Sequence, residues 1–440
     1  MGIDRSGLSP EVQRKVVFAG ANNPSFAQGS VALAELMDLE VNAKQVERVT
    51  ERIGQERCAE RDAAVERYLS LPLVERKGKP ADVQAPEVAV VGVDGGRVQI
   101  RDDSWLSQAA SAATATPAET EEEETLPSDD QHRGKHWRED KIGLLMTMQS
   151  EEQESDPCPQ VPSAFVDPTR IVKLTRELKT KRSATVEENK QEAAGDTDTP
   201  EEAEQVLREA GDRVEWQPPE VETKQLTATR QPWKAFGPMV AALAWTMGFY
   251  QAARKAFIGD GAENNWTLWR KHFSSFVPIL DIIHAISYVF AAAMAGRSFA
   301  EGWNCYVRWI GWVWGGEVEK VIVELAQRQA ELGTPQEADA DTHPRVIVDK
   351  ALTYLQNHKG KMRYPEYRRK GLPITSSYLE SAVKQFNQRV KGSEKFWTED
   401  GVEGLLQLRG DYLGTTNPLN EFWQTRQENA TGQATYSLAA

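Results

Sequence analysis

Three carboxylates lie at the ends or starts of segments whose sequence patterns predict strands or a helix, and these elements could bring the carboxylates together. Asp94 follows the β-branched run 88–93, Asp260 follows a second apolar run, and Glu380 lies near the start of an amphipathic segment. Taken singly, each is ordinary, because Asp-Gly is a common hairpin turn and a helical glutamate is usually solvated. Together they could supply the hard oxygen ligands that Mg²⁺ prefers, with Mn²⁺ as a substitute. Two such ions promote in-line displacement at phosphorus without a covalent protein nucleophile.

The segments that must position these carboxylates show strand patterns. Residues 88–101 predict a strand, a turn at Asp94-Gly95-Gly96 and a second strand, and residues 141–148 predict a third strand of the same sheet. Residues 240–257 predict a helix running into a strand that ends at Gly259-Asp260, and residues 277–281 predict a further buried strand. Asp94 and Asp260 would then close neighbouring strands.

Helical patterns complete the organisation. A helix is expected to begin near Ser376, capped by Ser376 or Ser377, and to carry Glu380. A mostly helical insertion is expected near 286–360. An antiparallel hairpin followed by strands that alternate with helices describes an α+β or mixed α/β sheet, and a ribonuclease-H-like fold has that layout. This domain would span residues 87–413.

The N-terminal residues 1–76 predict a small helical domain. Two helices would flank a turn near 38–41, with Asn42 and Gln45 forming a capping box. The second helix would bury Val46, Val49 and Ile53 and leave Lys44, Arg48 and Arg52 outward. A helix-turn-helix would place such a helix in a DNA groove. A small bundle with a solvated basic face is the alternative.

Charge is distributed unevenly along the chain. The 52 basic and 66 acidic residues give a net charge of −14, whereas DNA-handling proteins are more often basic. The acidic residues concentrate in low-complexity insertions near 104–130 and 185–225, while residues 359–395 hold ten Lys or Arg against three Asp or Glu. The negative net charge therefore comes mainly from these insertions and not from the segment around Glu380. The polar residues 417–440 are expected to form a flexible tail.

Two classes of protein are disfavoured. The three cysteines form no CxxC pair, which argues against a cysteine-rich zinc site and a disulfide framework and fits a reducing cytosol. The apolar segment 276–296 is long enough to raise a membrane-span prediction, but Asp281 and His284 inside it would be costly in lipid. A buried strand followed by a buried helix explains it better. We therefore expect a cytoplasmic protein without a membrane partner.

Five ordered blocks resemble one known family. In order along the chain they are VGVDGGRVQIR, WREDKIGLL, FIGDGAENNW, ILDIIHAISYVFAAA and ITSSYLESAVKQFNQRVKGSEKFW. They look like the transposases of ISKra-type bacterial insertion sequences, and the resemblance covers roughly residues 10–413. It implies a DDE transposase with a ribonuclease-H-like catalytic domain, in which Asp94, Asp260 and Glu380 match the three metal-binding acidic residues. The acidic insertions lengthen the interval between the two aspartates.

Asp281 and His284 resemble a D(2)H signature found between the second Asp and the Glu of several transposase groups, which implies a site-supporting role. A histidine on an apolar strand or helix is also often a satisfied core residue, so both interpretations stay open. The chain departs from other groups in two respects: it has no N-terminal Cys-pair zinc finger, and Asn387 stands seven residues after Glu380 where a lysine would complete a Tyr-Arg-Glu-Lys spacing.

Basic residues surround Glu380 in the sequence and could follow DNA phosphates. They are Lys384, Arg389 and Lys391 after it and Arg368, Arg369 and Lys370 before it. A solvated amphipathic helix is the alternative.

The resemblance implies specific partners and steps. The chain would bind double-stranded DNA at the inverted-repeat ends of its element, hydrolyse it at two Mg²⁺ ions and join the 3′-OH ends to target DNA. It would act as a homo-oligomer in a synaptic complex, associated with the bacterial nucleoid. A domesticated DNA-binding protein without catalysis and a ribonuclease-H-like nuclease without strand transfer are the rival interpretations.

Overall fold

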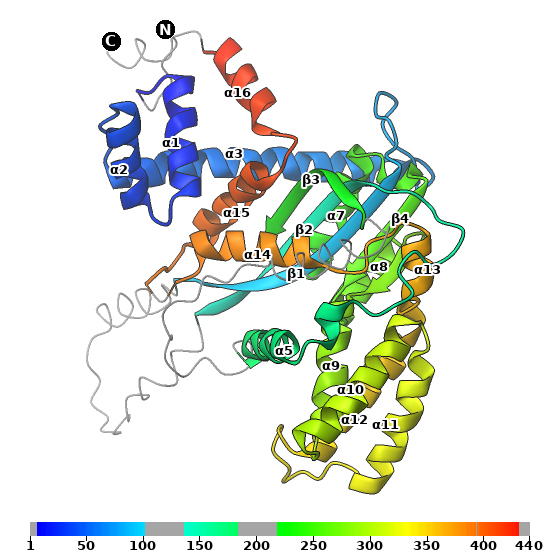
Figure 1. The fold of residues 1–440 in the computed structure, drawn as a ribbon. Helices are drawn as coiled ribbons and strands as arrows, with labels where there is room; N and C mark the ends of the chain where they lie inside the picture. Colours follow the sequence, from blue (N-terminus) through cyan, green and yellow to red (C-terminus); the bar gives the residue numbers. More distant parts are fainter. Residues whose placement is uncertain (1–6, 102–135, 184–217, 393, 431–440) are drawn as a thin grey trace, which may run out of the picture.

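The computed structural model describes residues 7–101, 136–183, 218–392 and 394–430. Its centre is a five-stranded mixed sheet in the order β3-β2-β1-β4-β5 (Figure 1). The first three strands are antiparallel neighbours, and β4 and β5 run parallel to β1. The strands are β1 Val88–Gln99, β2 Trp137–Gln149, β3 Glu220–Thr229, β4 Arg254–Gly259 and β5 Val277–Leu280. The predicted mixed α/β class is confirmed.

Strand β1 is continuous through Asp94, so the turn predicted at Asp94-Gly95-Gly96 is wrong. Asp94 pairs with Ile142 in the middle of the β1–β2 ladder, and Gly96 pairs with Asp140. A Cβ at Gly96 would lie 2.8 Å from Asp140 Oδ1, closer than side chains allow. The glycine therefore makes room for the Asp140 carboxylate on the neighbouring strand, and it does not reverse the chain.

Strand β3 corrects a second prediction. It begins at Glu220, inside the segment 185–225 expected to be irregular. Its first half is polar and only its second half, with Leu226 and Ala228, is buried, which hides the alternation that identifies a strand. The sequence of residues 201–210 also favours a helix, but residues 185–217 and the whole of 104–130 lie outside the described residues.

Helices cover both faces of the sheet. On one face α7 (Trp233–Thr246) lies close enough to β2 that a Cβ at Gly143 would be 3.0 Å from Val240 Cγ2, and α8 (Glu263–His272) lies beside β4. On the other face, α14 (Ser377–Val390) packs on β1 and α15 (Glu399–Leu413) packs on β3. Because side chains alternate along β1, the face that carries Asp94 is the α14 face.

A helical unit follows β5. It comprises α9 (Ile282–Met294), α10 (Phe299–Trp314), α11 (Val318–Leu332) and α12 (Pro344–His358), which pack side by side at one end of the sheet (Figure 1). Helix α5 (Pro168–Ser183) packs against α9, and the short α13 (Tyr364–Arg369) leads back to the sheet. The prediction of a buried strand and a buried helix in 276–296 is confirmed by β5 and α9. Among the described residues, no helix is long and apolar enough to cross a membrane.

The N-terminal helices are α1 (Pro10–Asn22), α2 (Phe26–Met37) and α3 (Ala43–Ser70). Asn42 caps α3 through its contact with the Gln45 amide, and Val46, Val49 and Ile53 are buried, as predicted. Arg52 is half-buried, however, and donates to Gln13 of α1 at 3.1 Å. The prediction that Arg52 faces outward is therefore wrong, whereas Arg48 is exposed.

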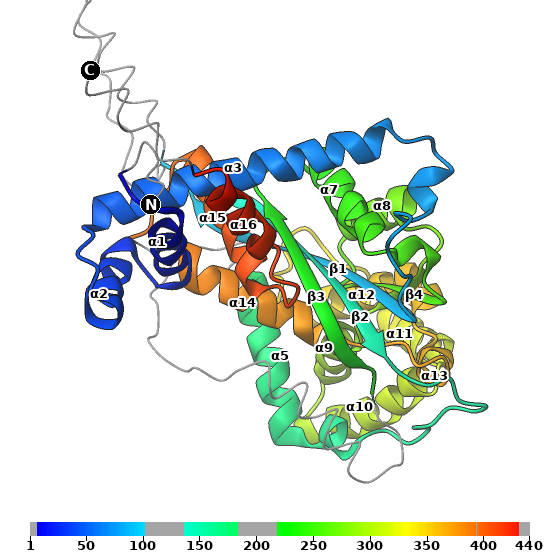
Figure 2. The same ribbon diagram turned by 90° about the horizontal axis from the view of Figure 1, so that it is seen from above.

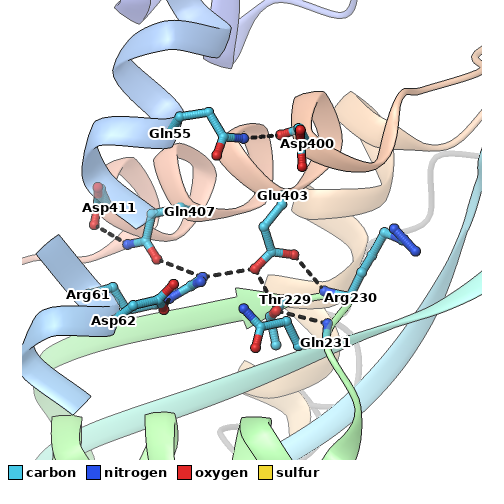
Figure 3. Close-up of polar contacts among 10 residues, drawn as sticks. All are labelled: Gln55, Arg61, Asp62, Thr229, Arg230, Gln231, Asp400, Glu403, Gln407 and Asp411. Carbon is cyan, nitrogen blue, oxygen red and sulfur yellow. Dashed lines mark hydrogen bonds and ion pairs between the residues drawn. The ribbon is translucent and has the colours of Figure 1, made fainter. Parts of the chain in front are cut away.

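Helix α3 extends past the small N-terminal bundle and packs against α15 and α7 (Figures 1 and 2). A polar network joins α3, α15 and the end of β3 (Figure 3). Glu403 of α15 accepts hydrogen bonds from Arg61 Nη1 at 3.0 Å, Thr229 Oγ1 at 2.6 Å and the Arg230 amide at 2.9 Å. The network thereby fastens α3 and α15 to the edge strand of the sheet.

The predicted flexible tail is ordered in part. Residues 419–428 form α16 (Leu419–Glu428), whose Leu419 and Trp423 are buried beside α1. Arg426 also forms an ion pair with Glu56 of α3 at 2.5 Å. The tail prediction is wrong for this helix, because two apolar residues spaced four apart bury one face of an otherwise polar segment.

Candidate functional site

Asp94 and Asp260 lie on adjacent parallel strands. Gly92 of β1 aligns with Ile258 of β4, and two further residues along each strand bring Asp94 beside Asp260. Burial and then the Asp260 carboxylate raise the pKa of Asp94 to about 7, with a further contribution from Glu380. The Gly95 amide, which donates to Asp94 Oδ1 at 2.7 Å, and His284 oppose this rise. The two aspartates therefore form one negatively charged pair.

Asn265 ties this pair together and was not identified from the sequence. Its amide donates to Asp260 Oδ1 at 2.9 Å and to the Val93 carbonyl at 3.2 Å, so one side chain bridges the two strands. The Ala262 amide donates to the same Asp260 oxygen at 2.9 Å. Asn265 is buried at the start of α8, and the only sequence signal was an amide five residues after the second aspartate.

Helix α14 brings Glu380 to the same face. Leu379 packs against β1, since a Cβ at Gly92 would lie 3.2 Å from Leu379 Cδ2. Glu380 sits in the first turn, and its electrostatic influence reaches both Asp94 and His284. The helix begins at Ser377, close to the predicted position, but neither predicted serine cap forms: Ser376 occupies the cap position without a capping hydrogen bond.

The hydroxyl of Ser376 instead donates to Asp281 Oδ2 at 2.6 Å. Asp281 has no exposed side-chain area and caps α9 by accepting from the Ile283 amide at 3.0 Å. Asp281 Oδ2, the oxygen that accepts from Ser376, also contacts His284 Nδ1 at 2.8 Å. One buried carboxylate thus joins the start of α9 to the start of α14, and thereby fixes the turn that carries Glu380.

His284 is held as a cation. Burial disfavours the charged imidazole, but the hydrogen bond to Asp281 and the nearby carboxylates Asp260 and Glu380 raise the pKa of His284 to about 9. Burial opposes ionisation of Asp281 as well, yet His284 and Ser376 lower the pKa of that carboxyl. An imidazolium beside the carboxylates offsets part of their mutual repulsion.

The donor set suits a divalent cation. Asp281, His284 and Glu380 each offer one ligand atom within 4.8 Å of the others. Asp281 already accepts three contacts. Asp94 and Asp260 lie outside this group but close to Glu380, and they carry further oxygen ligands of the kind that a hard cation prefers. The elevated pKa of Asp94 is consistent with a carboxylate cluster that a bound cation would neutralise.

Two of the arginines predicted to contact DNA are structural. Arg368 has no exposed side-chain area: it pairs with Asp156, with Nε 2.8 Å from Oδ1, and its guanidinium lies 4.1 Å from the Trp314 ring centroid. Arg389 is buried, donates to the Gly20 carbonyl at 3.0 Å and so fastens α14 to α1. The prediction of DNA contact is wrong for both, because their guanidinium groups hold the fold together.

The remaining predicted basic residues lie at or near the surface. Lys391 and Arg48 are exposed, and Lys384, Arg369 and Lys370 are partly exposed. Lys391 lies at the end of α14 with its ammonium 5.3 Å from the Trp137 ring centroid. These five residues reach the surface, and Lys370 pairs there with Glu366 at 2.8 Å.

Asp140 is a further acidic residue on the Asp94 face that the sequence did not single out. It pairs with Gly96, is fully buried, and neither carboxylate oxygen has a hydrogen-bond partner among the described residues. Burial raises the pKa of Asp140 to about 6. The face beside the two aspartates thus carries more acid than the predicted triad alone.

No protein-family model matches this chain, and no curated protein shows significant similarity to it.

Proposed function

We propose that this chain is a DDE DNA transposase, similar to those of ISKra-type insertion sequences, with a ribonuclease-H-like catalytic domain. The observation that carries the proposal is the gathering of Asp94, Asp260 and Glu380 at one place, from β1, the end of β4 and the first turn of α14. Residues far apart in the sequence supply three hard ligands on one face of a sheet, which is the donor set that metal-dependent phosphoryl transfer uses.

The topology supports the fold part of this proposal. Three antiparallel strands in the order β3-β2-β1, continued by the parallel strands β4 and β5, are compatible with a ribonuclease-H-like sheet, although β3 was not among the strands predicted from the sequence. The first acidic residue stands on the central strand, and the last stands on a helix that crosses that strand. Asp94, in the middle of β1, lies beside Asp260, which directly follows β4.

The roles of the residues follow from their contacts. Asp94, Asp260 and Glu380 would hold two Mg²⁺ ions, with Mn²⁺ as a substitute, which supply a nucleophile at neutral pH and stabilise the leaving oxygen. Asn265 would hold Asp260 in place, and Asp281 would orient α14 through Ser376. In the first step, water attacks phosphorus and the bond to the 3′ oxygen breaks, leaving a 3′-OH. In the second, that 3′-OH attacks a target phosphodiester and the displaced oxygen leaves with a proton.

The test is metal-dependent cleavage of duplex DNA that carries the ends of the element. These ends are identified in the genome as inverted repeats on either side of the gene, flanked by a target duplication. Asp94→Asn, Asp260→Asn and Glu380→Gln should each reduce cleavage by about a thousand-fold, equivalent to roughly 4 kcal/mol of transition-state stabilisation. Glu319→Gln, an exposed carboxylate of α11, is the matched control and should cleave normally. Normal cleavage by the three site variants would refute the assignment.

Two rival functions use the same scaffold and are separated by the same assays. A nuclease without strand transfer would nick DNA but fail to join a supplied 3′-OH end to a second duplex. A domesticated DNA-binding protein would bind the ends and cleave nothing. The three acidic residues, and the Asn265 and Asp281 contacts that position them, favour the catalytic function.

A further inference from the structure

A cavity of about 650 Å³ opens directly beyond the second aspartate. It lies between α8, α9 and the end of α12, and Gly261, which follows Asp260, forms part of its wall. The Tyr354 hydroxyl, from the opposite wall, donates to the Asp260 carbonyl at 2.7 Å. The cavity and the carboxylate site therefore share one stretch of backbone, and its volume falls within the range of small-molecule sites.

Aromatic side chains form the wall of this cavity. Tyr288 stacks on Tyr354 with ring centroids 3.7 Å apart, and His358 packs edge-on against Tyr354 at 4.8 Å. Trp266 Nε1 and His358 Nδ1 are buried and have no hydrogen-bond partner within the described part of the chain. Burial lowers the pKa of His358 to about 4, so its ring is neutral at pH 7. The wall thus combines buried aromatic rings with polar and charged side chains, among them Asp349, Thr353 and Asn357.

Cations stand at the mouth of the cavity. The Lys361 ammonium lies 4.7 Å from the Trp266 ring centroid, and burial together with Arg270 lowers the pKa of Lys361, although Glu263 opposes this. Arg270 is paired with Glu263, whose side chain is 75% exposed. The cations Lys361, Arg270 and Lys350 line the cavity together with two carboxylates, Glu263 and Asp349, so the positive charges outnumber the negative ones and would stabilise an anion.

We propose that this cavity binds one nucleotide of the DNA strand that passes the carboxylate site. Its phosphate would lie on Lys361 and Arg270, and its sugar and base beside Tyr288, an aromatic lining residue that is partly exposed. This inference rests on the proposed function for the identity of the strand. A nucleotide fits the site better than a bare anion, because the cavity offers an aromatic side chain for the base beside cations for the phosphate.

The test uses the full chain without metal and a fluorescein-labelled six-nucleotide oligothymidylate, with binding followed by fluorescence anisotropy. Lys361→Gln should weaken binding about ten-fold or more, the effect of losing one charge-assisted hydrogen bond. Lys361→Arg should restore most of it. The matched control is Lys359→Gln, which removes the same charge from an exposed residue that does not line the cavity.

Lys350→Gln is a second variant, because Lys350 lines the cavity but is exposed and pairs with the exposed Asp341, so its loss leaves the core intact. It should weaken binding several-fold. Equal losses for Lys361→Gln and Lys359→Gln would overturn the proposal, since binding would then depend on general charge. Inorganic phosphate that binds through Lys361, with no oligonucleotide bound, would also overturn it and leave only an anion site.

The outcome is independent of the catalytic assignment. Oligonucleotide binding is measured without metal. Lys361-dependent binding in a protein that never cleaves DNA would therefore refute the transposase proposal and support the cavity as a nucleotide site. Conversely, metal-dependent cleavage by a chain whose oligonucleotide binding ignores Lys361 would keep the catalytic function and remove the cavity from it.

Discussion

Replacing Asp94 by asparagine should abolish cleavage and, at the same time, stabilise the metal-free fold. The substitution keeps the shape of the side chain and the oxygen that accepts from the Gly95 amide. It removes a negative charge that is disfavoured by burial and by the adjacent Asp260. The site would therefore lose function and gain stability through the same charge.

The size of the gain follows from the pKa of Asp94. A rise from 3.8 to about 7 corresponds to an upper limit of about 4 kcal/mol in the free energy of unfolding. The side chain is partly exposed, so water screens some of this repulsion. We expect Asp94→Asn to raise the free energy of unfolding by roughly 2 kcal/mol at pH 8.

The stability difference between Asp94→Asn and the wild-type chain should depend on pH. Below pH 3.8 the wild-type carboxyl is protonated in both the folded and the unfolded chain, so the two proteins should be equally stable there. Between 3.8 and about 7 only the unfolded chain ionises, and the advantage of the variant should grow with pH. Above about pH 7 both states are ionised and the advantage should be constant.

The assay is urea unfolding of both proteins in EDTA from pH 4 to pH 9, repeated with excess Mg²⁺ at pH 8. Added Mg²⁺ should stabilise the wild-type chain, because a ligand that binds only the folded state raises the free energy of unfolding. It should leave Asp94→Asn nearly unchanged. A variant that is less stable than wild type at pH 8 in EDTA would refute the electrostatic reasoning, and an equal response to Mg²⁺ would remove Asp94 from the cation site.

Three further predictions concern neighbouring residues. Asp140→Asn should also stabilise the metal-free chain at pH 8, by roughly 1–2 kcal/mol, because burial raises the pKa of Asp140 from 3.8 to about 6; unlike Asp94→Asn it should respond to Mg²⁺ as wild type does, and an altered response would make it a ligand. His284→Ala should cost roughly 3 kcal/mol by leaving Asp281 without its cation, and should lower cleavage by about 10–100-fold, measured under conditions where both proteins are folded. The pKa of His284 is raised from 6.5 to about 9, so the stability that separates wild type from His284→Ala should be fully present below pH 6.5 and lost as the pH rises through 9. Glu403→Ala should cost roughly 2–3 kcal/mol in thermal or urea unfolding, because it removes the acceptor of the Thr229 hydroxyl and the Arg230 amide and one of the acceptors of Arg61, while cleavage per folded molecule stays normal; lost cleavage at full folding would give this network a role in the site.

The His284 variant illustrates what the sequence could and could not predict. The spacing of Asp281 and His284 placed both residues at the end of β5 and the start of α9, and the structure agrees. A partly exposed histidine would cost little stability when removed, but the imidazole is mostly buried against a carboxylate that Ser376 also contacts. That third partner comes from a segment nearly a hundred residues later, so no local pattern revealed it.

Local patterns succeeded where one element decides the structure. The apolar runs before Asp260 and Asp281 gave β4 and β5, and the polar-to-apolar spacing around Glu380 gave α14. They failed where a distant partner decides it. Gly96 makes room for the Asp140 carboxylate on the paired strand, but in the sequence it looked like part of a turn. Arg389 is buried against α1, but in the sequence it looked like a DNA contact. Neither partner is adjacent in the sequence.

The order in which the carboxylates are synthesised also has a consequence. Asp94 and Asp260 can pair as soon as β4 emerges, but Glu380 belongs to a helix whose residues are translated some 120 positions later. At elongation rates of about 5–20 residues per second, the nascent chain would spend roughly 6–24 s with two of the three carboxylates present. During that interval the repelling aspartates would lack both Glu380 and the Ser376 anchor. A truncated or unfinished chain would therefore hold an incomplete cluster, and any activity that needs all three carboxylates would arise only near the end of synthesis.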